Sequence, residues 1–553
     1  MLPPPALRGI FRTDTRARAA YSEGAGIYRI LPVAIARPAD INDVQILVTW
    51  ASEQHVALIP RGAGSAMAGG NVGEGVVVDL TGLARRLEVD AAARSALTSP
   101  GITLVELNAA AAGHLLRLPP DPSSARWATL GGMVSTNAAG ARSVRYGSVR
   151  RWVEGLTLIT SEGEPVTLRR GQEANPPDAP ALIRFNRDVA PRIRAAAPVV
   201  AARFPRSRKN SSGYALDAYL ASGDVIDLII GAEGTLGIIA EIEWRLDAIP
   251  PFRAGLRLEL ASLDRLGDVV AALNRCQPSA LELLDRSFLD LVGSDRLAPG
   301  RAGDPPEAIL LIELERDDAS ALQGVLAEAA AAAQSRATKV ETAASPAEAD
   351  RLWAIRHAAS PILAGLPEDR RSLQVIEDAC VPLNRMGEYI STVRRLAAER
   401  RITVVMFGHA GDGHIHVNLL PELARPDWVA QVAGLLDDVT AAVIRMGGTP
   451  SGEHGDGRLR SGTLLALYGP EILDLFREVK RAFDPAGIFN PGIILPSGEP
   501  PISRLKVGSN AVPIPADLQQ ALRQIELTGG YGRSRLELAD EEPTSSSRAT
   551  RGT

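Results

Sequence analysis

The chain has 553 residues, of which 45% are hydrophobic and 23% are charged. This ordinary globular composition excludes a disordered chain and a fibrous repeat. At roughly 100 to 200 residues per domain, the length corresponds to about three structural units. The net charge is -5, with 60 basic and 65 acidic residues spread along the chain, and only 4% of residues are aromatic. We therefore expect no nucleic-acid partner.

The two cysteines, Cys276 and Cys380, are too few for a disulfide framework or a cysteine-ligated iron–sulfur cluster. Any redox chemistry would therefore need another cofactor. The N-terminus mixes Pro, Arg and Asp without the apolar run of a signal peptide. No stretch approaches the roughly 18 apolar residues of a membrane span. We expect a cytoplasmic protein, with peripheral association at the inner membrane as an alternative.

The first half of the chain alternates β-branched runs with helical stretches, which is typical of an α/β or α+β domain. Strands are predicted over residues 76–80, 95–100, 153–160 and 237–246, and helices over 40–54 and 103–113. Asp40 is the predicted N-cap of the first helix. The stiff Pro250-Pro251 link then predicts a domain boundary near residue 249.

The second half begins with two similar strand–helix–strand units, at 255–285 and 308–343. Two such units predict a small antiparallel sheet covered by helices. Residues 344–365 are predicted to be helical, 403–409 and 414–420 to form a strand pair, and 428–448 to form a helix that Gly447 or Gly448 closes. An amphipathic stretch at 516–527 predicts a further helix packed on the body.

Three glycine-rich loops, at residues 60–71, 129–140 and 231–239, lie next to predicted strands. Glycine permits positive φ angles and close approach of backbone N–H groups to an anion. The first loop lacks the Walker lysine and the GxGxxG spacing, which excludes a P-loop and a Rossmann motif. Taken alone, it could equally be a surface loop, but three such loops in one region favour a large dinucleotide cofactor.

Four of the seven histidines fall between residues 409 and 454. In an ideal strand His409 and His416 would point to opposite faces, but the glycine turn at 411–413 can bring them together. Two imidazoles and a carboxylate such as Glu453 form a common open site for a divalent ion. The alternative is that these are hydrogen-bonded polar residues of a turn-rich region.

The glycine-rich loops, together with Pro120-Asp121, Tyr146-Gly147 and residues 211–216, resemble the flavin-binding domain of the vanillyl-alcohol oxidase/p-cresol methylhydroxylase (PCMH) superfamily. The resemblance implies that the loops wrap the pyrophosphate and isoalloxazine of FAD. Ser65 stands where some members carry the covalently linked histidine, which implies non-covalent FAD. The residues that the resemblance assigns to the cofactor are Arg61, Gly62, Ala63, Gly64, Ser65, Gly69, Asn71, Pro120, Asp121, Thr129, Gly131, Gly132, Ser135, Asn137, Gly140, Glu233, Gly234, Gly237, Ile238, Ile239 and, in the closing segment 483–496, Asn490.

Residues 408–418 and 451–457 resemble the GHxGDGNxHxN and SGEHG motifs of FAD-linked D-2-hydroxyacid dehydrogenases. This family includes D-lactate and D-2-hydroxyglutarate dehydrogenases and the catalytic subunit of glycolate oxidase. The resemblance covers residues 25–497 and assigns a divalent ion, Zn or Mn, to His409, His416 and Glu453. It implies that His454 is the base, that Asn418 supports the substrate and that Arg356, in a WxxR helix, holds the substrate carboxylate.

The sequence departs from these motifs at three positions. His414 replaces the usual Asn, which makes it either a fourth ligand or a solvent-facing residue. His357 replaces the Glu that usually follows the WxxR arginine. Ile376 stands where relatives that take dicarboxylic acids carry Lys, which favours a monocarboxylate such as D-lactate or glycolate over 2-hydroxyglutarate.

The resemblance implies an α+β fold, with a PCMH-type FAD-binding domain of two subdomains and a ferredoxin-like cap domain whose C-terminal segment returns to the flavin. We expect an N-terminal segment (1–29), the FAD-binding domain (30–249), the cap (250–497), a helical extension (498–537) and a disordered tail (538–553).

The expected activity is metal-assisted oxidation of a small D-2-hydroxy acid to the 2-oxo acid by hydride transfer to FAD. Electrons would pass to a separate quinone, cytochrome, flavoprotein or iron–sulfur subunit, or to oxygen, and a homodimer is one option for assembly. Two alternatives stay open: a non-catalytic FAD-binding electron-transfer subunit, and a flavin-dependent synthase without net redox.

Overall fold

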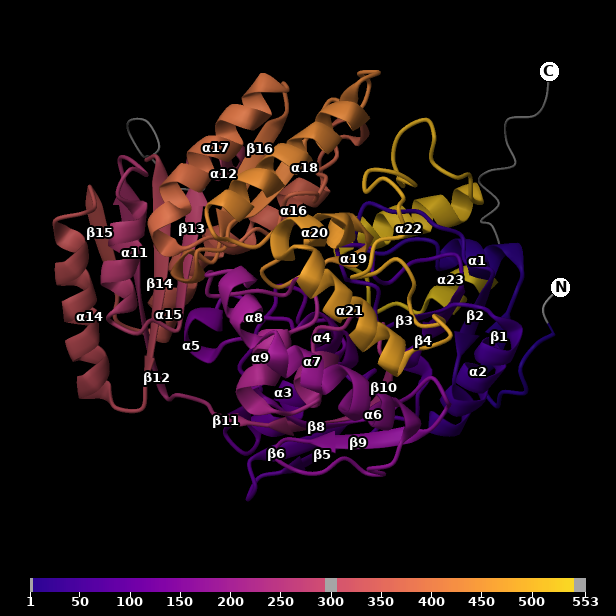
Figure 1. Cartoon of the computed structure of the whole chain (residues 1–553). Coiled ribbons are helices and arrows are strands. Elements are labelled where there is room, and N and C mark those ends of the chain that lie inside the picture. The colour runs from indigo at the N-terminus through magenta and orange to yellow at the C-terminus, as the bar shows by residue number, and fades with distance from the viewer. Residues whose placement is uncertain (1–2, 294–305, 542–553) are drawn as a thin grey trace, which may run out of the picture.

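The computed structural model describes residues 3–293 and 306–541, which form three large sheets, one two-stranded sheet and the helices packed on them (Figure 1). The predicted α+β class is confirmed. The first sheet has the order β1-β2-β4-β3, in which β2 (Ala34–Arg37), β4 (Val76–Asp79) and β3 (Leu58–Arg61) are parallel and β1 (Ile10–Arg12) is antiparallel. Helix α2 (Ile41–Gln54) covers this sheet. Its predicted N-cap is confirmed, because the Asp40 side chain accepts a hydrogen bond from the Asp43 amide.

The second sheet is antiparallel and has the order β5-β6-β10-β8-β9. Its strands are β5 (Leu87–Asp90), β6 (Ser95–Thr98), β10 (Ile238–Arg245), β8 (Val153–Ile159) and β9 (Pro165–Arg169). Two short strands, β7 (Leu116–Arg117) and β11 (Asp247–Ala248), pair beside it. The helices of this part are α3 (Leu104–Ala112), α4 (Leu130–Thr136), α5 (Ser143–Tyr146), α6 (Pro180–Arg184), α7 (Ala190–Ala195), α8 (Ala197–Arg203), α9 (Leu216–Ser222) and α10 (Ile226–Ile229).

The third sheet has the order β15-β12-β14-β13-β16-β17 and is antiparallel throughout. Its first four strands form the two predicted strand–helix–strand units in ferredoxin-like order. The strands are β12 (Phe252–Leu260), β13 (Ala280–Asp285), β14 (Ala308–Arg316), β15 (Lys339–Ala343), β16 (Thr403–Gly408) and β17 (His416–Leu420). The helices are α11 (Leu266–Asn274), α12 (Arg286–Val292), α14 (Ala319–Gln334), α15 (Pro346–His357), α16 (Ala359–Ala364), α17 (Met386–Glu399) and α18 (Trp428–Arg445).

Helices cover both faces of this third sheet, which explains the nearly continuous apolar run of β14. Leu310 and Ile312 join the core formed with α11 and α14, whereas Ile309 and Leu311 join the core formed with α12 and α16. Successive side chains of a strand point to opposite faces, so a strand buried on both sides needs apolar residues at consecutive positions.

The closing segment returns to the first sheet after α19 (Gly457–Arg460), α20 (Leu464–Tyr468) and α21 (Pro470–Phe483). The Asn490 amide donates to the Leu58 carbonyl of β3 (2.9 Å). Beyond it, α22 (Ala516–Thr528) and α23 (Arg535–Asp540) pack against α1 (Thr15–Ala20), so the predicted helix on the body is confirmed.

The predicted start of the disordered tail at residue 538 is wrong, because Leu538 and Ala539 are buried in α23. Residues 542–553 of that prediction lie outside the described residues.

Partly buried ion pairs join the first half of the chain to the cap. Arg142 Nε lies 2.7 Å from Glu313 Oε1, and Arg117 Nη2 lies 2.9 Å from Glu315 Oε2, both on β14.

None of the helices within the described ranges is long and apolar enough to cross a membrane.

Candidate active site

A cavity of about 470 Å³ lies where the three glycine-rich loops, the cap and the C-terminal extension meet. The second loop contains the short helix α4, which was not predicted; Thr129 caps it and Asn137 ends it with φ 53°. Of the residues assigned to the cofactor, those that line the cavity are Arg61, Gly62, Ala63, Gly64, Ser65, Asn71, Thr129, Gly131, Gly132, Ser135, Glu233, Gly234, Gly237 and Ile239.

The other assigned residues do not line the cavity and instead support its walls: Gly69, Pro120, Asp121, Asn137, Gly140, Ile238 and Asn490. Asn490 Nδ2 donates to the carbonyls of Gly70 and Glu233 (both 2.8 Å) and so joins the first loop to the third. Asp121 forms an ion pair with Arg142 (2.8 Å). Asn490 thus holds two of the loops together without lining the cavity.

Glycines let the loops that line the cavity pack closely against their neighbours. A Cβ on Gly62 would lie 2.1 Å from the Thr129 hydroxyl, so the first two loops touch only because Gly62 has no side chain. Gly64 and Gly234 have φ near +80° and +70°, a region that favours glycine. These cradles leave backbone N–H groups available to a phosphate or a heterocycle edge.

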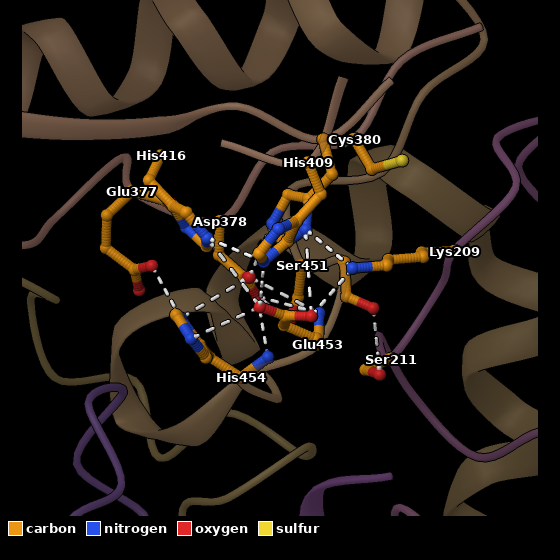
Figure 2. Close-up of polar contacts among 12 residues, drawn as sticks. Lys209, Ser211, Glu377, Asp378, Cys380, His409, His416, Ser451, Glu453 and His454 are labelled. Atoms are coloured by element: carbon orange, nitrogen blue, oxygen red, sulfur yellow. Dashed lines mark hydrogen bonds and ion pairs between the residues drawn. The ribbon is translucent and has the colours of Figure 1, made fainter. Parts of the chain in front are cut away.

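His409, His416, Glu453 and His454 line one wall of the same cavity. Figure 2 shows these four side chains pointing toward one another. His409 follows β16 and His416 begins β17, and the glycine turn between them brings their Nε2 atoms to 3.2 Å. Glu453 Oε1 lies 3.1 Å from His409 Nε2 and 3.7 Å from His416 Nε2. Three side chains that were predicted to share a divalent ion thus converge at one point.

The other ring nitrogen of each histidine is already engaged. His416 Nδ1 lies 2.9 Å from the Glu377 carbonyl, so it is the donor, and the lone pair is on Nε2, which faces His409 Nε2. His409 Nδ1 lies 2.5 Å from Glu282 Oε1, and Arg356 Nε donates to the other oxygen of Glu282 (2.8 Å). Histidines that hold a metal are commonly oriented in this way by a carboxylate or a carbonyl.

The charges around the cluster shift its pKa values in different directions. Burial is the largest influence on the pKa of His409 and lowers it, but the charges of Glu282 and Glu453 and the hydrogen bond to Glu282 together raise it to about 9. Burial and the neighbouring histidines lower the pKa of His416. Burial would raise the pKa of Glu453, yet the charges of Lys209, His409 and His414 together hold it well below its usual range. A divalent ion would therefore meet the neutral imidazole of His416, the carboxylate of Glu453 and the ring of His409, which must first lose a proton.

His414 is fully buried, so its predicted solvent-facing alternative is wrong. Its Nε2 lies 2.9 Å from Asp378 Oδ1 and its Nδ1 lies 3.3 Å from Lys209 Nζ. Lys209 Nζ also donates to Glu453 Oε2 (2.7 Å). His414 thus stands within reach of the other ligand atoms, but both of its ring nitrogens have partners.

His454, the predicted base, stacks on the His416 ring, with centroids 5.4 Å apart. Its Nδ1 lies 2.6 Å from Glu377 Oε2, and Arg460 pairs with the other oxygen of Glu377. Burial lowers the pKa of His454, but Glu377 and Asp378 raise it to about 10. In this arrangement His454 carries a proton at neutral pH.

The two remaining predicted residues also line the cavity. Asn418 Oδ1 accepts a hydrogen bond from the Ser372 hydroxyl (3.2 Å). The Arg356 guanidinium lies over the Phe407 ring, 4.5 Å from its centroid. Within the described chain only its Nε forms a hydrogen bond, to Glu282.

Four residues that hold the cluster were not predicted: Lys209, Glu282, Glu377 and Asp378. Two of them carried a signal in the sequence. Glu282 is an acidic residue inside an apolar strand, and a buried carboxylate usually has a specific partner. Lys209 is one of few lysines in an arginine-rich chain. Glu377 and Asp378 lie in an irregular segment whose sequence indicated no role.

Two sequence families match this chain. Residues 32–169 match the family described as FAD binding domain, and residues 249–494 match the family described as FAD linked oxidases, C-terminal domain. A D-lactate dehydrogenase of Archaeoglobus fulgidus is 31% identical over 83% of this chain and 91% of its own length. The glycolate oxidase subunit GlcD of Bacillus subtilis is 28% identical over 87% and 93%, and a D-2-hydroxyglutarate dehydrogenase of Xanthomonas citri pv. viticola is 30% identical over 85% and 90%.

Among solved structures, 4-ethylphenol oxidase from Gulosibacter chungangensis is similar, with a TM-score of 0.63 over 88% of this chain and 94% of that chain, at 15% identity. An alkyldihydroxyacetonephosphate synthase has a TM-score of 0.58 over 87% and 82%, at 17% identity. At these identities the similarity shows a shared fold alone.

Proposed function

The chain belongs to the family of FAD-linked oxidases, and from this premise we propose that it oxidises a small D-2-hydroxy acid to the 2-oxo acid. The observation that carries the proposal is the convergence of His409, His416 and Glu453 on the wall of the cavity that the three glycine-rich loops also line. A dinucleotide cradle and a divalent-ion donor set in one cavity suit a substrate with a hydroxyl and a carboxylate on neighbouring carbons.

The atoms that each side chain presents to the cavity indicate which role that residue would take in the reaction. Bound FAD would supply the electron sink, and a Zn or Mn ion would act as a Lewis acid towards the substrate oxygens. His409, His416 and Glu453 would hold the ion. Arg356 would face the substrate carboxylate with its terminal nitrogens, because Glu282 occupies only its Nε. Asn418 would support the substrate from the same wall.

His454 would take the hydroxyl proton at Nε2, because Glu377 holds its Nδ1. A base must be unprotonated, and the pKa of this ring is about 10 as it stands. That pKa would fall when a cation is held at His416, because His454 stacks on the His416 ring and like charges disfavour protonation.

The substrate is proposed to be a monocarboxylate such as D-lactate or glycolate. Ile376, at the position that carries Lys in relatives taking dicarboxylic acids, is buried and apolar. Arg371, another cation of the cap on the cavity wall, is already paired with Glu368 and Glu526. Among the described residues of the cap, apart from Arg356, no unpaired Arg or Lys is therefore left on the cavity wall to bind a second carboxylate of the substrate.

Electrons are proposed to leave for a separate acceptor, namely a quinone, a cytochrome, a flavoprotein or an iron–sulfur subunit. Cys276 and Cys380 are both buried and unpaired, and two cysteines do not hold a cluster that could relay electrons within the chain. Contact with a membrane-bound acceptor would be peripheral, and a homodimer is compatible with this scheme.

The test is anaerobic mixing of the flavin-loaded protein with D-lactate, glycolate, D-2-hydroxyglutarate and longer 2-hydroxy acids. Bleaching of the flavin by a monocarboxylate is expected. His409→Ala and Glu453→Ala should abolish bleaching and keep the flavin, whereas His114→Ala, at an exposed histidine, should behave as wild type. If no acid bleaches the flavin, the protein is better explained as a non-catalytic electron-transfer subunit or as a synthase without net redox. Normal bleaching in both cluster variants would refute the metal role.

A further inference from the structure

Gln374 presents a side-chain amide to the cavity. The residue lines the cavity wall and is half-buried. Within the described residues its amide forms no hydrogen bond, and unlike the fully buried unpaired atoms of the core it keeps exposed surface. A polar group that faces a cavity without a protein partner is available to a ligand, and a few such groups usually set the specificity of a pocket.

The segment that carries Gln374 lies antiparallel to β17. The Leu373 amide donates to the Leu419 carbonyl (2.8 Å), and the Leu419 amide donates to the Leu373 carbonyl (3.0 Å). Both leucines point into the core that α11 and α14 cover, so the next residues, Gln374 and Asn418, point to the opposite face, where both line the cavity. In this register Gln374 lies directly opposite Asn418, and the side chains of such a pair are neighbours.

On the cavity face of the sheet, His416 lies between Arg356 and Gln374. On one side, His416 pairs with Phe407 of β16, and the Arg356 guanidinium lies over the Phe407 ring, 4.5 Å from its centroid. On the other side of β17 lies the segment of Gln374, opposite Asn418, which is two residues along the strand from His416. A substrate held at the ion with its carboxylate towards Arg356 would therefore extend its far end towards Gln374.

A neutral amide suits a hydroxyl better than a methyl group or a carboxylate. Gln374 offers N–H donors and a carbonyl acceptor, and a hydroxyl can both accept and donate. A methyl group would displace water from the amide without replacing its hydrogen bonds, which costs free energy. A second carboxylate would need a cation, and Arg371, the cation of the same segment on the cavity wall, is already paired with Glu368 and Glu526.

We propose that Gln374 is a specificity-determining residue that binds a hydroxyl on C3 of the substrate, so that the preferred substrate is a 2,3-dihydroxy monocarboxylate. The proposal rests on the proposed function and narrows its substrate class. The 3-hydroxyl takes no part in the redox step. The C2–OH group becomes C2=O, the C2 hydrogen and two electrons go to FAD, and the hydroxyl proton goes to His454. The product would be the 3-hydroxy-2-oxo acid.

The test measures anaerobic reduction of the bound flavin by D-glycerate and by D-lactate, which differ only in the 3-hydroxyl. At low substrate concentration the wild-type protein should react about 10- to 100-fold faster with D-glycerate, because D-lactate leaves the Gln374 amide without a partner. Gln374→Met, which keeps the size of the side chain, should remove this preference. Gln520→Met, at an exposed glutamine of α22 that is not on the cavity wall, should keep the wild-type preference.

Gln374→Lys tests the placement of the residue through a gain of activity. An ammonium at this position would pair with a carboxylate carried on C3, so the rate with D-malate should rise about 10- to 100-fold relative to the rate with D-lactate. Flavin content and melting temperature should stay near the wild-type values in both Gln374 variants, because the side chain has no partner to lose within the described residues.

Three results would overturn the proposal. These are equal reduction of the wild-type protein by D-glycerate and D-lactate, a preference for D-glycerate that survives in Gln374→Met, and an unchanged ratio of D-malate to D-lactate rates in Gln374→Lys. Each of them is obtained with a flavin that at least one 2-hydroxy acid bleaches. Bleaching by none of the acids would instead refute the proposed function, and this proposal with it.

Discussion

Replacing Glu282 with glutamine tests how the histidine cluster is held. This carboxylate is fully buried on β13, with Oε1 2.5 Å from His409 Nδ1 and Oε2 2.8 Å from Arg356 Nε. Burial would raise the pKa of the Glu282 carboxyl, but the charges of His409 and Arg356 lower it to about 2. Glu282 is therefore ionised at neutral pH and orients His409 with a full negative charge.

Glutamine preserves the size of the side chain and one acceptor oxygen but removes the charge. Loss of the outer partner of a metal-binding histidine typically weakens metal affinity by about 10- to 100-fold. This range equals about 1.4 to 2.8 kcal/mol. We expect Glu282→Gln to lower the affinity for Zn or Mn by that amount and to leave FAD binding unchanged, because Glu282 is absent from the cavity wall.

The assay is a metal titration of chelator-treated protein, carried out near pH 9, where the proton on His409 competes less than at neutral pH. Glu315→Gln is the matched control. It removes a buried carboxylate from the neighbouring strand β14, where Glu315 pairs with Arg117 and Tyr146 and touches none of the histidines. Wild-type metal affinity in Glu282→Gln, or an equal loss in both variants, would refute the reasoning.

Three further predictions concern the scaffold. Gly69→Ala should reduce the flavin-to-protein ratio and lower stability by roughly 1 to 3 kcal/mol, because φ is +82° and a Cβ would lie 2.4 Å from the Tyr28 ring; Gly113→Ala, with open space around it, should be neutral. Arg142→Met should lower the melting temperature and cost about 3 kcal/mol, because Glu313 loses its main partner at the domain boundary; an unchanged melting temperature would contradict this. Asp14, the N-cap of α1, has a pKa that its hydrogen bond with Arg12 lowers from 3.8 to about 2. The ionised Asp14 therefore contributes its full stabilising free energy above its unfolded pKa of 3.8 and loses that contribution as the pH falls through about 2. In urea titrations, the difference in unfolding free energy between wild type and Asp14→Asn should shrink between these two pH values. A difference that stays constant over this range would refute the prediction.

Much of the fold could be predicted because local patterns carry it. The periodicity of apolar residues predicted the strands β4, β6, β8 and β10 and the helices α2 and α3. The repeated strand–helix–strand pattern predicted the cap sheet. The glycine turn at 411–413 predicted that His409 and His416 could meet, and their Nε2 atoms lie 3.2 Å apart. These features depend on residues close together in the sequence, where side-chain period and glycine geometry act directly.

Only the tertiary structure determines which residues hold the side chains of the site in place. Glu282 is 127 residues away from His409 in the sequence, and Lys209 is 244 residues away from Glu453. No local pattern encodes such a pair, because a buried charge finds its partner only when distant strands pack. The extension makes the same point: its amphipathic sequence predicted a helix on the body, but only the folded chain puts Tyr531 on the cavity wall.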